Sequence, residues 1–355
     1  MTEPQVKTRP LVSIVTPVYN EAGHIAECIE SVLAQTYQNW QYTVVDNCST
    51  DGSGEIAQRY AAKDARITVH RNAEFLRAIP NHNVALRQLQ PEAKYCKVVF
   101  ADDWLFPECV ERMVALAEAH PSVGIVSAYA LQGSKVLWTG LPYPSSIVSG
   151  RELCRKMFLE HCYVLGSATA MLYRAELVRG RDPFFNEGNL HADTETHVAL
   201  LRDCDFGFVH QVLSYSRDRE ESLSSFSSDM NTHFSSTLQL LVKYGPDFLA
   251  PDELERCTQA HLSMYYQYLG KNVILGRNDA FWMYHRLKMA EAGFPLKRRR
   301  VVAGLLSALG EALLNPQHAL ARLRFRRDAN RQAKRQPATS AAPGKVAATT
   351  IKEGG

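Results

Sequence analysis

The segment that decides the fold is Lys97-Val98-Val99-Phe100-Ala101-Asp102-Asp103-Trp104-Leu105-Phe106-Pro107, a short apolar run that ends in two adjacent carboxylates. The run predicts a buried strand ending at Asp102, and such strands in α/β sheets usually open onto ligand sites at that end. Two adjacent carboxylates repel each other, and a divalent cation relieves this repulsion. Oxygen ligands of this kind suit Mg²⁺ or Mn²⁺ shared with phosphate oxygens. A solvated acidic turn before a helix near Pro107 explains the pair alone equally well.

The composition sets wide bounds on the protein. Its 355 residues are enough for one large domain or for a domain with a substantial appendage. A net charge of only +3 argues against binding nucleic acid with the whole surface. Eight cysteines without a C-x-x-C spacing provide no obvious zinc site and indicate reduced, mostly buried thiols of the cytosol. The polar start, residues 1–9, lacks the apolar segment of a signal peptide, and no stretch is long enough for a transmembrane helix. We therefore expect a cytoplasmic protein.

Upstream of the acidic pair, strands and helices alternate. Strands are expected at 11–16, 42–45 and 66–69, and helices at 25–33, at 56–61 and from Pro80 onward. Asn20 is a candidate N-cap of the first helix. This order predicts an α/β fold with a doubly wound, mainly parallel sheet flanked by helices.

Acidic residues follow the ends of these strands. Glu21 follows the first strand, Asp46 ends the second, and Asp102 and Asp103 end the central one. In a parallel sheet these ends share one edge, so we expect the carboxylates to converge on one crevice. The sequence lacks G-x-G-x-x-G and G-x-x-x-x-G-K-[ST], which argues against a dinucleotide fold and against a P-loop enzyme.

Three segments in this order resemble the family 2 glycosyltransferases of GT-A fold: Ser13-Ile14-Val15-Thr16-Pro17-Val18-Tyr19-Asn20-Glu21, Val45-Asp46-Asn47-Cys48-Ser49-Thr50-Asp51-Gly52-Ser53 and Ala101-Asp102-Asp103. The resemblance covers roughly residues 10–224. It implies inverting transfer of a sugar from a nucleoside-diphosphate sugar, with a UDP-sugar as the expected donor. The acceptor would be a hydroxyl of a saccharide or of a lipid-linked compound, in polysaccharide or glycolipid assembly.

The resemblance also implies roles for the donor-side residues. Thr16, Pro17 and Tyr19 would line the pocket of the base, because an aromatic face supports a flat ring. Glu21 would lie near the ribose, and Asp46 would accept a hydrogen bond from the base. For the two carboxylates after the central strand, the resemblance implies that Asp103 would bind Mn²⁺ or Mg²⁺ and that Asp102 would face the ribose or the metal.

On the acceptor side, Gly166 to Arg174 resembles a strand of the family, and Asp193 is the implied catalytic base. The family commonly has Glu-Asp at this place, but this chain has Ala192 before Asp193. An N-cap of the following helix is therefore the competing interpretation of Asp193. The spacing of Asp193 and His197 could also bind a metal, although a lone histidine on a helix is usually structural. Arg217 or Arg219 would contact the diphosphate or complete the surroundings of the metal.

After residue 225 the resemblance ends. We expect a flexible N-terminus at 1–9, a GT-A catalytic domain at 10–225, a helical extension at 226–335 and a disordered tail at 336–355. Lys297-Arg298-Arg299-Arg300 precedes a short apolar segment that could lie on an anionic membrane surface, which would make the protein peripheral on the inner face. A core helix with basic flanks is the other interpretation. Two alternative functions remain open at this point, a nucleotidyltransferase on a similar scaffold and a non-catalytic nucleotide-sugar binder or scaffold.

Overall fold

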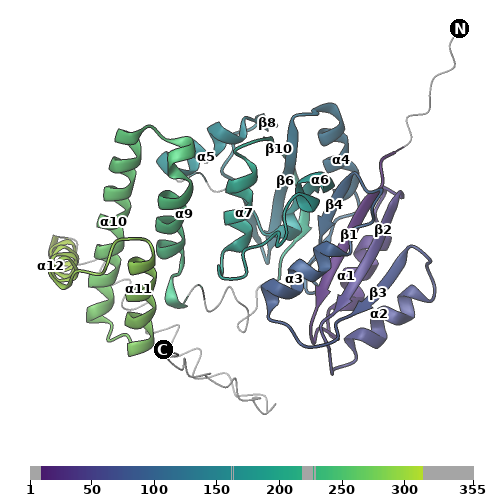
Figure 1. Cartoon of the computed structure of the whole chain (residues 1–355), viewed down its shortest axis with the longest axis horizontal. Helices are drawn as coiled ribbons and strands as arrows, with labels where there is room; N and C mark the ends of the chain where they lie inside the picture. The colour runs from purple at the N-terminus through teal and green to yellow at the C-terminus, as the bar shows by residue number, and fades with distance from the viewer. Residues whose placement is uncertain (1–8, 161, 163, 218–226, 228, 315–355) are drawn as a thin grey trace, which may run out of the picture. The chain divides into compact units, whose positions relative to one another are not determined.

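The computed structural model describes residues 9–160, 162, 164–217, 227 and 229–314 (Figure 1). The chain divides into two compact units, one made of Met1–Leu262 with Asn278–Leu296 and the other of Ser263–Arg277 with Lys297–Gly355.

The first unit begins with the alternation that the sequence predicts. Apolar strands and amphipathic helices follow one another in the order β1 (Val12–Val18), α1 (Ile25–Leu33), β2 (Trp40–Asp46), α2 (Ser53–Ala61), β3 (Ile67–Arg71), α3 (Ala78–Arg87) and β4 (Tyr95–Val98).

The second half of the sheet is built from longer and more irregular connections. Its elements are β5 (Trp104–Leu105), α4 (Cys109–Ala119), β6 (Val123–Gln132), β7 (Lys135–Leu137), β8 (Ile147–Val148), α5 (Gly150–Glu160), the 3₁₀ turn η1 (Ala168–Ala170), β9 (Met171–Arg174), α6 (Ala175–Arg179), α7 (Ala192–Leu200) and β10 (Asp205–Tyr215).

In the described residues these strands form a ten-stranded sheet with the order β3-β2-β1-β4-β9-β6-β10-β5, while β7 pairs with β6 and β8 with β10. Strands β1 to β4 are mutually parallel, and β6 is parallel to β10. Strand β9 runs antiparallel between β4 and β6. The expected doubly wound, mainly parallel sheet is confirmed, and the carboxyl ends of β2, β1 and β4 lie next to one another.

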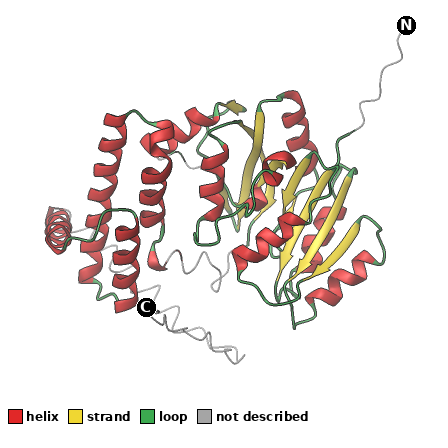
Figure 2. Ribbon diagram, in the orientation of Figure 1, coloured by secondary structure: helices red, strands yellow, loops and turns green. Residues whose placement is uncertain are grey.

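Helices cover both faces of the sheet (Figure 2). The residues of β1 alternate between two cores: Ile14 packs with Ile25 and Ile29 of α1, whereas Val15 belongs to the core of the opposite face with Leu86 of α3. Because side chains alternate along a strand, a strand buried on both faces needs apolar residues at nearly every position. This explains why the predicted strands are continuous apolar runs.

Two local expectations are wrong. Strand β4 ends at Val98, so Asp102 and Asp103 lie in the turn before β5 and not at the last strand position. Asn20 does not cap α1, because the helix begins at Ile25 with His24 as its N-cap. Asn20 has a φ of 52° and its side-chain oxygen accepts a hydrogen bond from the Thr50 backbone N–H, so it fixes a loop instead.

The remaining helices are α9 (His233–Phe248), α10 (Pro251–Ile274), α11 (Asp279–Glu291) and α12 (Arg298–Leu314). In the second unit, α12 crosses α10 at two glycines: a Cβ on Gly304 would come within 2.2 Å of the Tyr266 carbonyl oxygen, and one on Gly270 within 2.2 Å of the Leu305 nitrogen. Such backbone contact requires glycine. None of the described helices combines the length and the apolar character needed to cross a membrane. The predicted tail at 336–355 lies outside the described residues, as do residues 1–8 of the predicted flexible N-terminus.

Candidate active site

The loops that follow β1 and β2 are joined by hydrogen bonds. The backbone N–H of Asn20 donates to the Ser49 hydroxyl at 3.1 Å, and the N–H of Glu21 donates to the Ser53 hydroxyl at 2.7 Å. The Glu21 carboxylate also pairs with His24 at 3.1 Å. Ser49 and Ser53 of the loop after β2 therefore accept hydrogen bonds from the backbone of the loop after β1. These bonds join the two loops into one surface.

Asp46, the last residue of β2, is 1% exposed. One carboxylate oxygen accepts the Ser49 backbone N–H at 3.0 Å, and the other lies 3.8 Å from Nε of Arg71. A Cβ on Gly54 would come within 2.8 Å of Asp46 Oδ2. The loop thus holds the carboxylate in one place, with an arginine on its open side.

Two exposed aromatic rings lie together after β1 and β3. Tyr19 is 44% and Phe75 is 56% exposed, and their ring centroids are 4.7 Å apart at 55°. Large exposed aromatic rings on a loop are typical of a binding surface. Phe75 was not predicted as a site residue, because its only signal in the sequence is an aromatic residue in the polar loop after the third strand.

Thr16 is placed differently from Tyr19. Its side chain is fully buried on the α1 face, where its hydroxyl accepts a hydrogen bond from Tyr42 at 2.8 Å and lies 3.9 Å from the Cys28 sulfur. Thr16 therefore supports the strand from inside and has no exposed surface in this structure. Pro17, which is also buried, is on the opposite side of the strand because side chains alternate.

The acidic turn contains one buried and one half-buried carboxyl group. Asp103 is 3% exposed, and its Oδ1 accepts the Arg217 backbone N–H at 3.0 Å. Burial, followed by repulsion from Asp102, raises the pKa of Asp103 to about 7. The guanidinium of Arg217 donates to the Asp102 carbonyl at 3.1 Å and pairs with Glu27 of α1 at 2.7 Å. One arginine therefore fixes the turn against the first helix, and Arg219 lies outside the described residues.

A second feature that the sequence analysis missed lies behind this turn. Lys97 is completely buried in β4, and its ammonium group donates to the backbone carbonyls of Thr169 and Met171. The Thr169 hydroxyl accepts the Phe100 N–H at 3.1 Å and also bonds to Asp103. In the sequence, the only indication of this contact is a lysine within an otherwise apolar strand. Its burial lowers the pKa of Lys97, and its hydrogen bonds tie the acceptor-side segment to the acidic turn.

Asp193 is the second residue of α7, and His191 is the N-cap without a side-chain hydrogen bond. The Asp193 carboxylate accepts the N–H of its neighbour Thr194 at 2.7 Å. Its charge acts on Tyr173, His197 and His233. The competing N-cap interpretation is therefore not what the structure shows.

The neighbouring acidic residue has different surroundings. Glu195, 6% exposed, accepts hydrogen bonds from Lys243 at 2.6 Å and from Asn189 at 2.7 Å. Burial alone would raise the pKa of Glu195, but these bonds outweigh it and lower the pKa. His197 is fully buried and contacts the Tyr173 hydroxyl at 2.7 Å. Among the described residues no group of three or more His, Cys, Asp or Glu side chains could hold a metal ion, and the Asp193–His197 pair stays a prediction.

The structure thus brings the loop residues around Tyr19, Glu21 and Asp46 together at adjacent strand ends. The acidic turn joins them through Arg217 and Glu27, and through Cys28 of α1, whose sulfur is 3.5 Å from the Phe100 carbonyl oxygen. Asp193 belongs to a separate group of contacts around Tyr173.

The family model for glycosyl transferase family 2 matches residues 13–177. The chain is 31% identical over 222 residues to EpsE of Bacillus subtilis (strain 168), named as a glycosyltransferase, and the match covers 59% of this chain and 79% of EpsE. The chain belongs to glycosyl transferase family 2.

Solved structures agree with the glycosyltransferase fold. The S. aureus protein TarS, crystallised with UDP-GlcNAc, matches with a TM-score of 0.59 at 19% identity over 80% of this chain and 81% of the TarS chain. The mannosyltransferase PcManGT from Pyrobaculum calidifontis, crystallised with GDP-Man and Mn²⁺, matches with a TM-score of 0.52 at 17% identity over 85% and 88% of the two chains. Family membership makes this chain a glycosyltransferase, so neither a nucleotidyltransferase nor a non-catalytic scaffold is supported.

Proposed function

We propose that this glycosyltransferase moves a sugar, with inversion, from a nucleoside-diphosphate sugar to a hydroxyl of a saccharide or lipid-linked acceptor. The observation that carries the proposal is the order of the sheet, in which the carboxyl ends of β2, β1 and β4 are neighbours. Asp46 ends β2, the Tyr19–Phe75 ring pair includes the residue after β1, and the Asp102–Asp103 turn follows β4. A base needs a flat apolar surface and a hydrogen-bond acceptor, and a diphosphate needs a site that tolerates its charge.

In this proposal the base lies on Tyr19 and Phe75, and the buried residues Thr16 and Pro17 support the strand that carries Tyr19. Asp46 accepts from an N–H of the base, and Glu21 lies near the ribose. Of the neighbouring cations, Arg71 is 3.8 Å from Asp46 and faces the same surface. The solved structures with UDP-GlcNAc and with GDP-Man support a nucleotide-sugar donor, for which a UDP-sugar is the first candidate.

The acidic turn fits a hard divalent cation such as Mn²⁺ or Mg²⁺. Such ions are commonly held by one or two carboxylates and complete their coordination with substrate phosphates. Asp103 and Asp102 offer adjacent carboxyl groups, and the raised pKa of Asp103, about 7, reflects a buried charge that has no full compensation from protein groups. When bound there, the cation would neutralise charge on the departing nucleoside diphosphate. The Mn²⁺ in PcManGT supports this assignment.

Asp193 is the proposed general base. Inversion by direct displacement requires the acceptor hydroxyl to lose its proton as the new bond forms, and a carboxylate is the simplest acceptor. Asp193 is half-buried at the start of α7. Glu195, fixed by Lys243, is unsuited to this role.

Direct assays test the donor part of the proposal. Calorimetric titration of the full chain with UDP-, GDP- and dTDP-sugars, each with and without Mn²⁺, should show one donor class that binds more tightly with the cation. Transfer to saccharide and lipid-linked acceptors should then give a product of inverted anomeric configuration. A retained configuration, or binding to none of these donors, would contradict the proposal.

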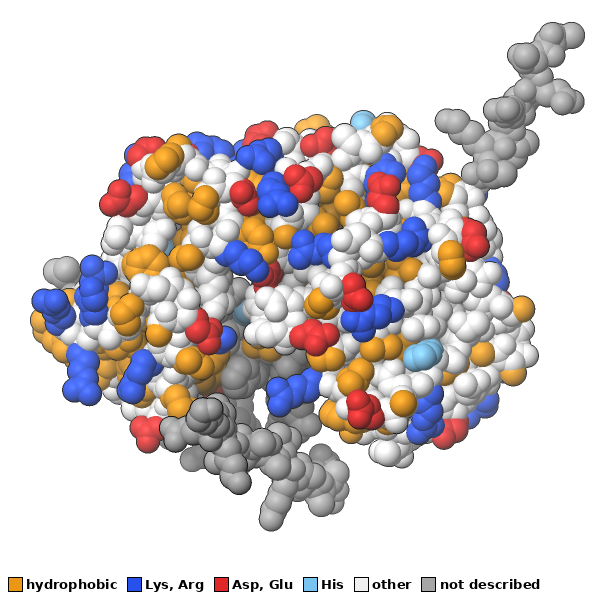
Figure 3. Space-filling model, viewed as in Figure 1, with side chains coloured by type: hydrophobic (Ala, Val, Ile, Leu, Met, Phe, Trp, Pro, Cys, Tyr) orange, Lys and Arg blue, Asp and Glu red, His pale blue; other side chains and the backbone are white. Residues whose placement is uncertain are grey.

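We also propose that α12 lies on an anionic membrane surface. Val302, Leu306 and Leu309 follow one another at helical spacing and are 53%, 64% and 44% exposed. The buried side of the helix is the one that carries Val301 and Gly304, which packs on α10. The basic residues 297–300 are all exposed, and Figure 3 shows Lys and Arg side chains gathered around apolar ones over α12. An apolar row with adjoining cations is typical of helices at membrane surfaces.

A further inference from the structure

A hollow of about 310 Å³ with a mixed polar and apolar lining lies between the loop before α7, helix α9 and helix α11 of the first unit. A second hollow of about 150 Å³ adjoins it and shares the residues Gly188, Asn189, Gln239 and Lys288. The larger one is within the size range of ligand pockets, roughly 300–1,000 Å³. None of the residues assigned to donor binding, to the cation or to proton transfer lines it.

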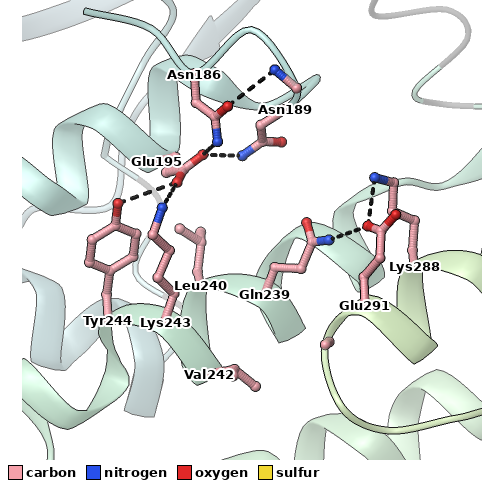
Figure 4. Close-up of a pocket in the computed structure, with 12 residues that line it drawn as sticks. Asn186, Asn189, Glu195, Gln239, Leu240, Val242, Lys243, Tyr244, Lys288 and Glu291 are labelled. Atoms are coloured by element: carbon pink, nitrogen blue, oxygen red, sulfur yellow. Dashed lines mark hydrogen bonds and ion pairs between the residues drawn. The ribbon is translucent and has the colours of Figure 1, made fainter. Parts of the chain in front are cut away.

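Two polar clusters form opposite sides of the hollow (Figure 4). In the first, Glu195 is held by Lys243, Tyr244 and the amides of Asn186 and Asn189. Because four side chains donate to one buried carboxylate, this wall is fixed before any ligand arrives, which lowers the entropic cost of binding.

The second cluster comes from the facing helices. Glu291 accepts hydrogen bonds from Lys288 at 2.9 Å and from Gln239 at 3.2 Å. Leu240 and Val242 of α9 add apolar surface to the lining. The walls therefore alternate hydrogen-bond donors, acceptors and small apolar patches.

The charges of the lining cancel, since Lys243 and Lys288 are matched by Glu195 and Glu291. A phosphate or nucleotide would meet two carboxylates in this hollow, and a lipid chain would leave the two ion pairs and the amide groups of the lining without polar partners on the ligand. A neutral ligand rich in hydroxyl groups suits these walls, because each hydroxyl can donate to a carboxylate and accept from an ammonium or amide. Its C–H faces would lie on the apolar patches.

We propose that this hollow binds the sugar units of a neutral oligosaccharide. Asn186 and Asn189 belong to the loop that leads directly into α7, whose second residue is Asp193. The natural ligand would accordingly be the part of a saccharide acceptor beyond its reacting hydroxyl, and this last identification rests on the proposed function. The binding itself requires neither donor nor transfer.

Saturation-transfer NMR and calorimetry on the full chain, without donor, test the proposal with short neutral oligosaccharides of the glucose, galactose, mannose and N-acetylglucosamine series. We expect at least one series to bind saturably. Gln239→Leu and Lys288→Met each remove a polar group from the lining, and each should weaken that binding about tenfold, the effect of losing one hydrogen bond of ordinary strength. Arg286→Met is the matched control, because Arg286 is an exposed cation of the same helix outside the hollow.

Failure of every series to bind, or binding that Gln239→Leu and Lys288→Met leave unchanged, would overturn the proposal. Nucleoside diphosphate affinity, measured on the same samples, should be equal in all variants. If the wild type binds a saccharide at the hollow but no nucleotide-sugar, the proposed function fails and this inference stands. If it binds donor but no saccharide, only this inference fails.

Discussion

Gly54 lies so close to Asp46 that a Cβ at position 54 would come within 2.8 Å of the carboxylate oxygen Oδ2. Asp46 is 1% exposed and bonded to the Ser49 N–H, so it has little room to move away. The absent side chain at position 54 therefore helps to fix the carboxylate that we assign to the base.

Gly54→Ala should displace the Asp46 carboxylate and weaken nucleotide-sugar binding about tenfold, equivalent to one hydrogen bond. Gly23→Ala is the matched control, because a Cβ on Gly23 of the adjoining loop has no neighbour within 4 Å. Calorimetric titration of both variants with the preferred donor measures the effect. Equal affinity of the two variants would show that the position of Asp46 is unimportant for the donor.

Asp103→Asn should abolish the increase in nucleoside diphosphate affinity that Mn²⁺ provides. Asparagine preserves the size and the acceptor for the Arg217 N–H but removes the charge that attracts a cation. Since burial and Asp102 raise the pKa of Asp103 to about 7, a neutral side chain should cause no loss of thermal stability. Calorimetry with and without Mn²⁺, together with melting temperatures, makes the comparison, and an unchanged cation effect would refute the assignment.

Asp193→Asn should reduce transfer by about 10²–10⁴-fold, the usual contribution of a general base, with little change in donor affinity. Glu195→Gln is the informative comparison. It removes the charge that pairs with Lys243 at 2.6 Å in a buried site and should lower the free energy of unfolding by about 1–3 kcal/mol. Turnover and urea unfolding of both variants separate the two roles. Near-normal transfer by the Asp193 variant, or a larger loss in the Glu195 variant, would move the base elsewhere.

Replacing Arg298, Arg299 and Arg300 by glutamine should release the protein from anionic vesicles, because each basic residue near such a surface contributes about 1 kcal/mol. Leu306→Ser should weaken the same binding by removing an exposed apolar contact, since this side chain is 64% exposed. Co-sedimentation with anionic and with uncharged vesicles measures both. A wild-type protein that ignores anionic vesicles would make α12 a packing element only.

The free energy of unfolding should fall as the pH is lowered from about 6.5 toward 4, in part because of His197. Its pKa is lowered from 6.5 to about 4 by burial, so the native chain binds fewer protons than the unfolded chain in this window. The neutral His197 ring contributes its full stabilisation above pH 6.5, the pKa of histidine in the unfolded chain. About 3 kcal/mol of this stabilisation is lost as the pH falls to about 4.

His197→Gln can retain a hydrogen bond to Tyr173 and should make the pH dependence less steep by up to one proton, about 1.4 kcal/mol per pH unit. Urea unfolding of wild type and variant across this range provides the measurement. Parallel curves for the two proteins would show that His197 titrates normally.

The local patterns predicted much of the catalytic fold. Continuous apolar runs, amphipathic helices and turn clusters located the strands and helices from β1 to β4, because a strand covered on both faces leaves a clear signal. The motif order placed Asp46 and the acidic pair on one edge of the sheet, since parallel strands must present their carboxyl ends at one edge. Boundaries were less accurate: β4 ends at Val98, where pairing with β1 stops, and no local pattern marks that point.

By itself, the sequence determined the family, the parallel half of the sheet and the carboxylates available for chemistry, because each depends on residue type and spacing along the chain. Only the tertiary structure decided which side chains meet. In the folded chain Tyr19 packs on Phe75, and the backbone of Arg217 bonds to the acidic turn. Thr16 and Lys97 are buried, and Glu195 forms an ion pair with Lys243. These contacts join residues far apart in the sequence, and they follow from the packing of whole elements. Spacing along one strand or helix carries no information about them.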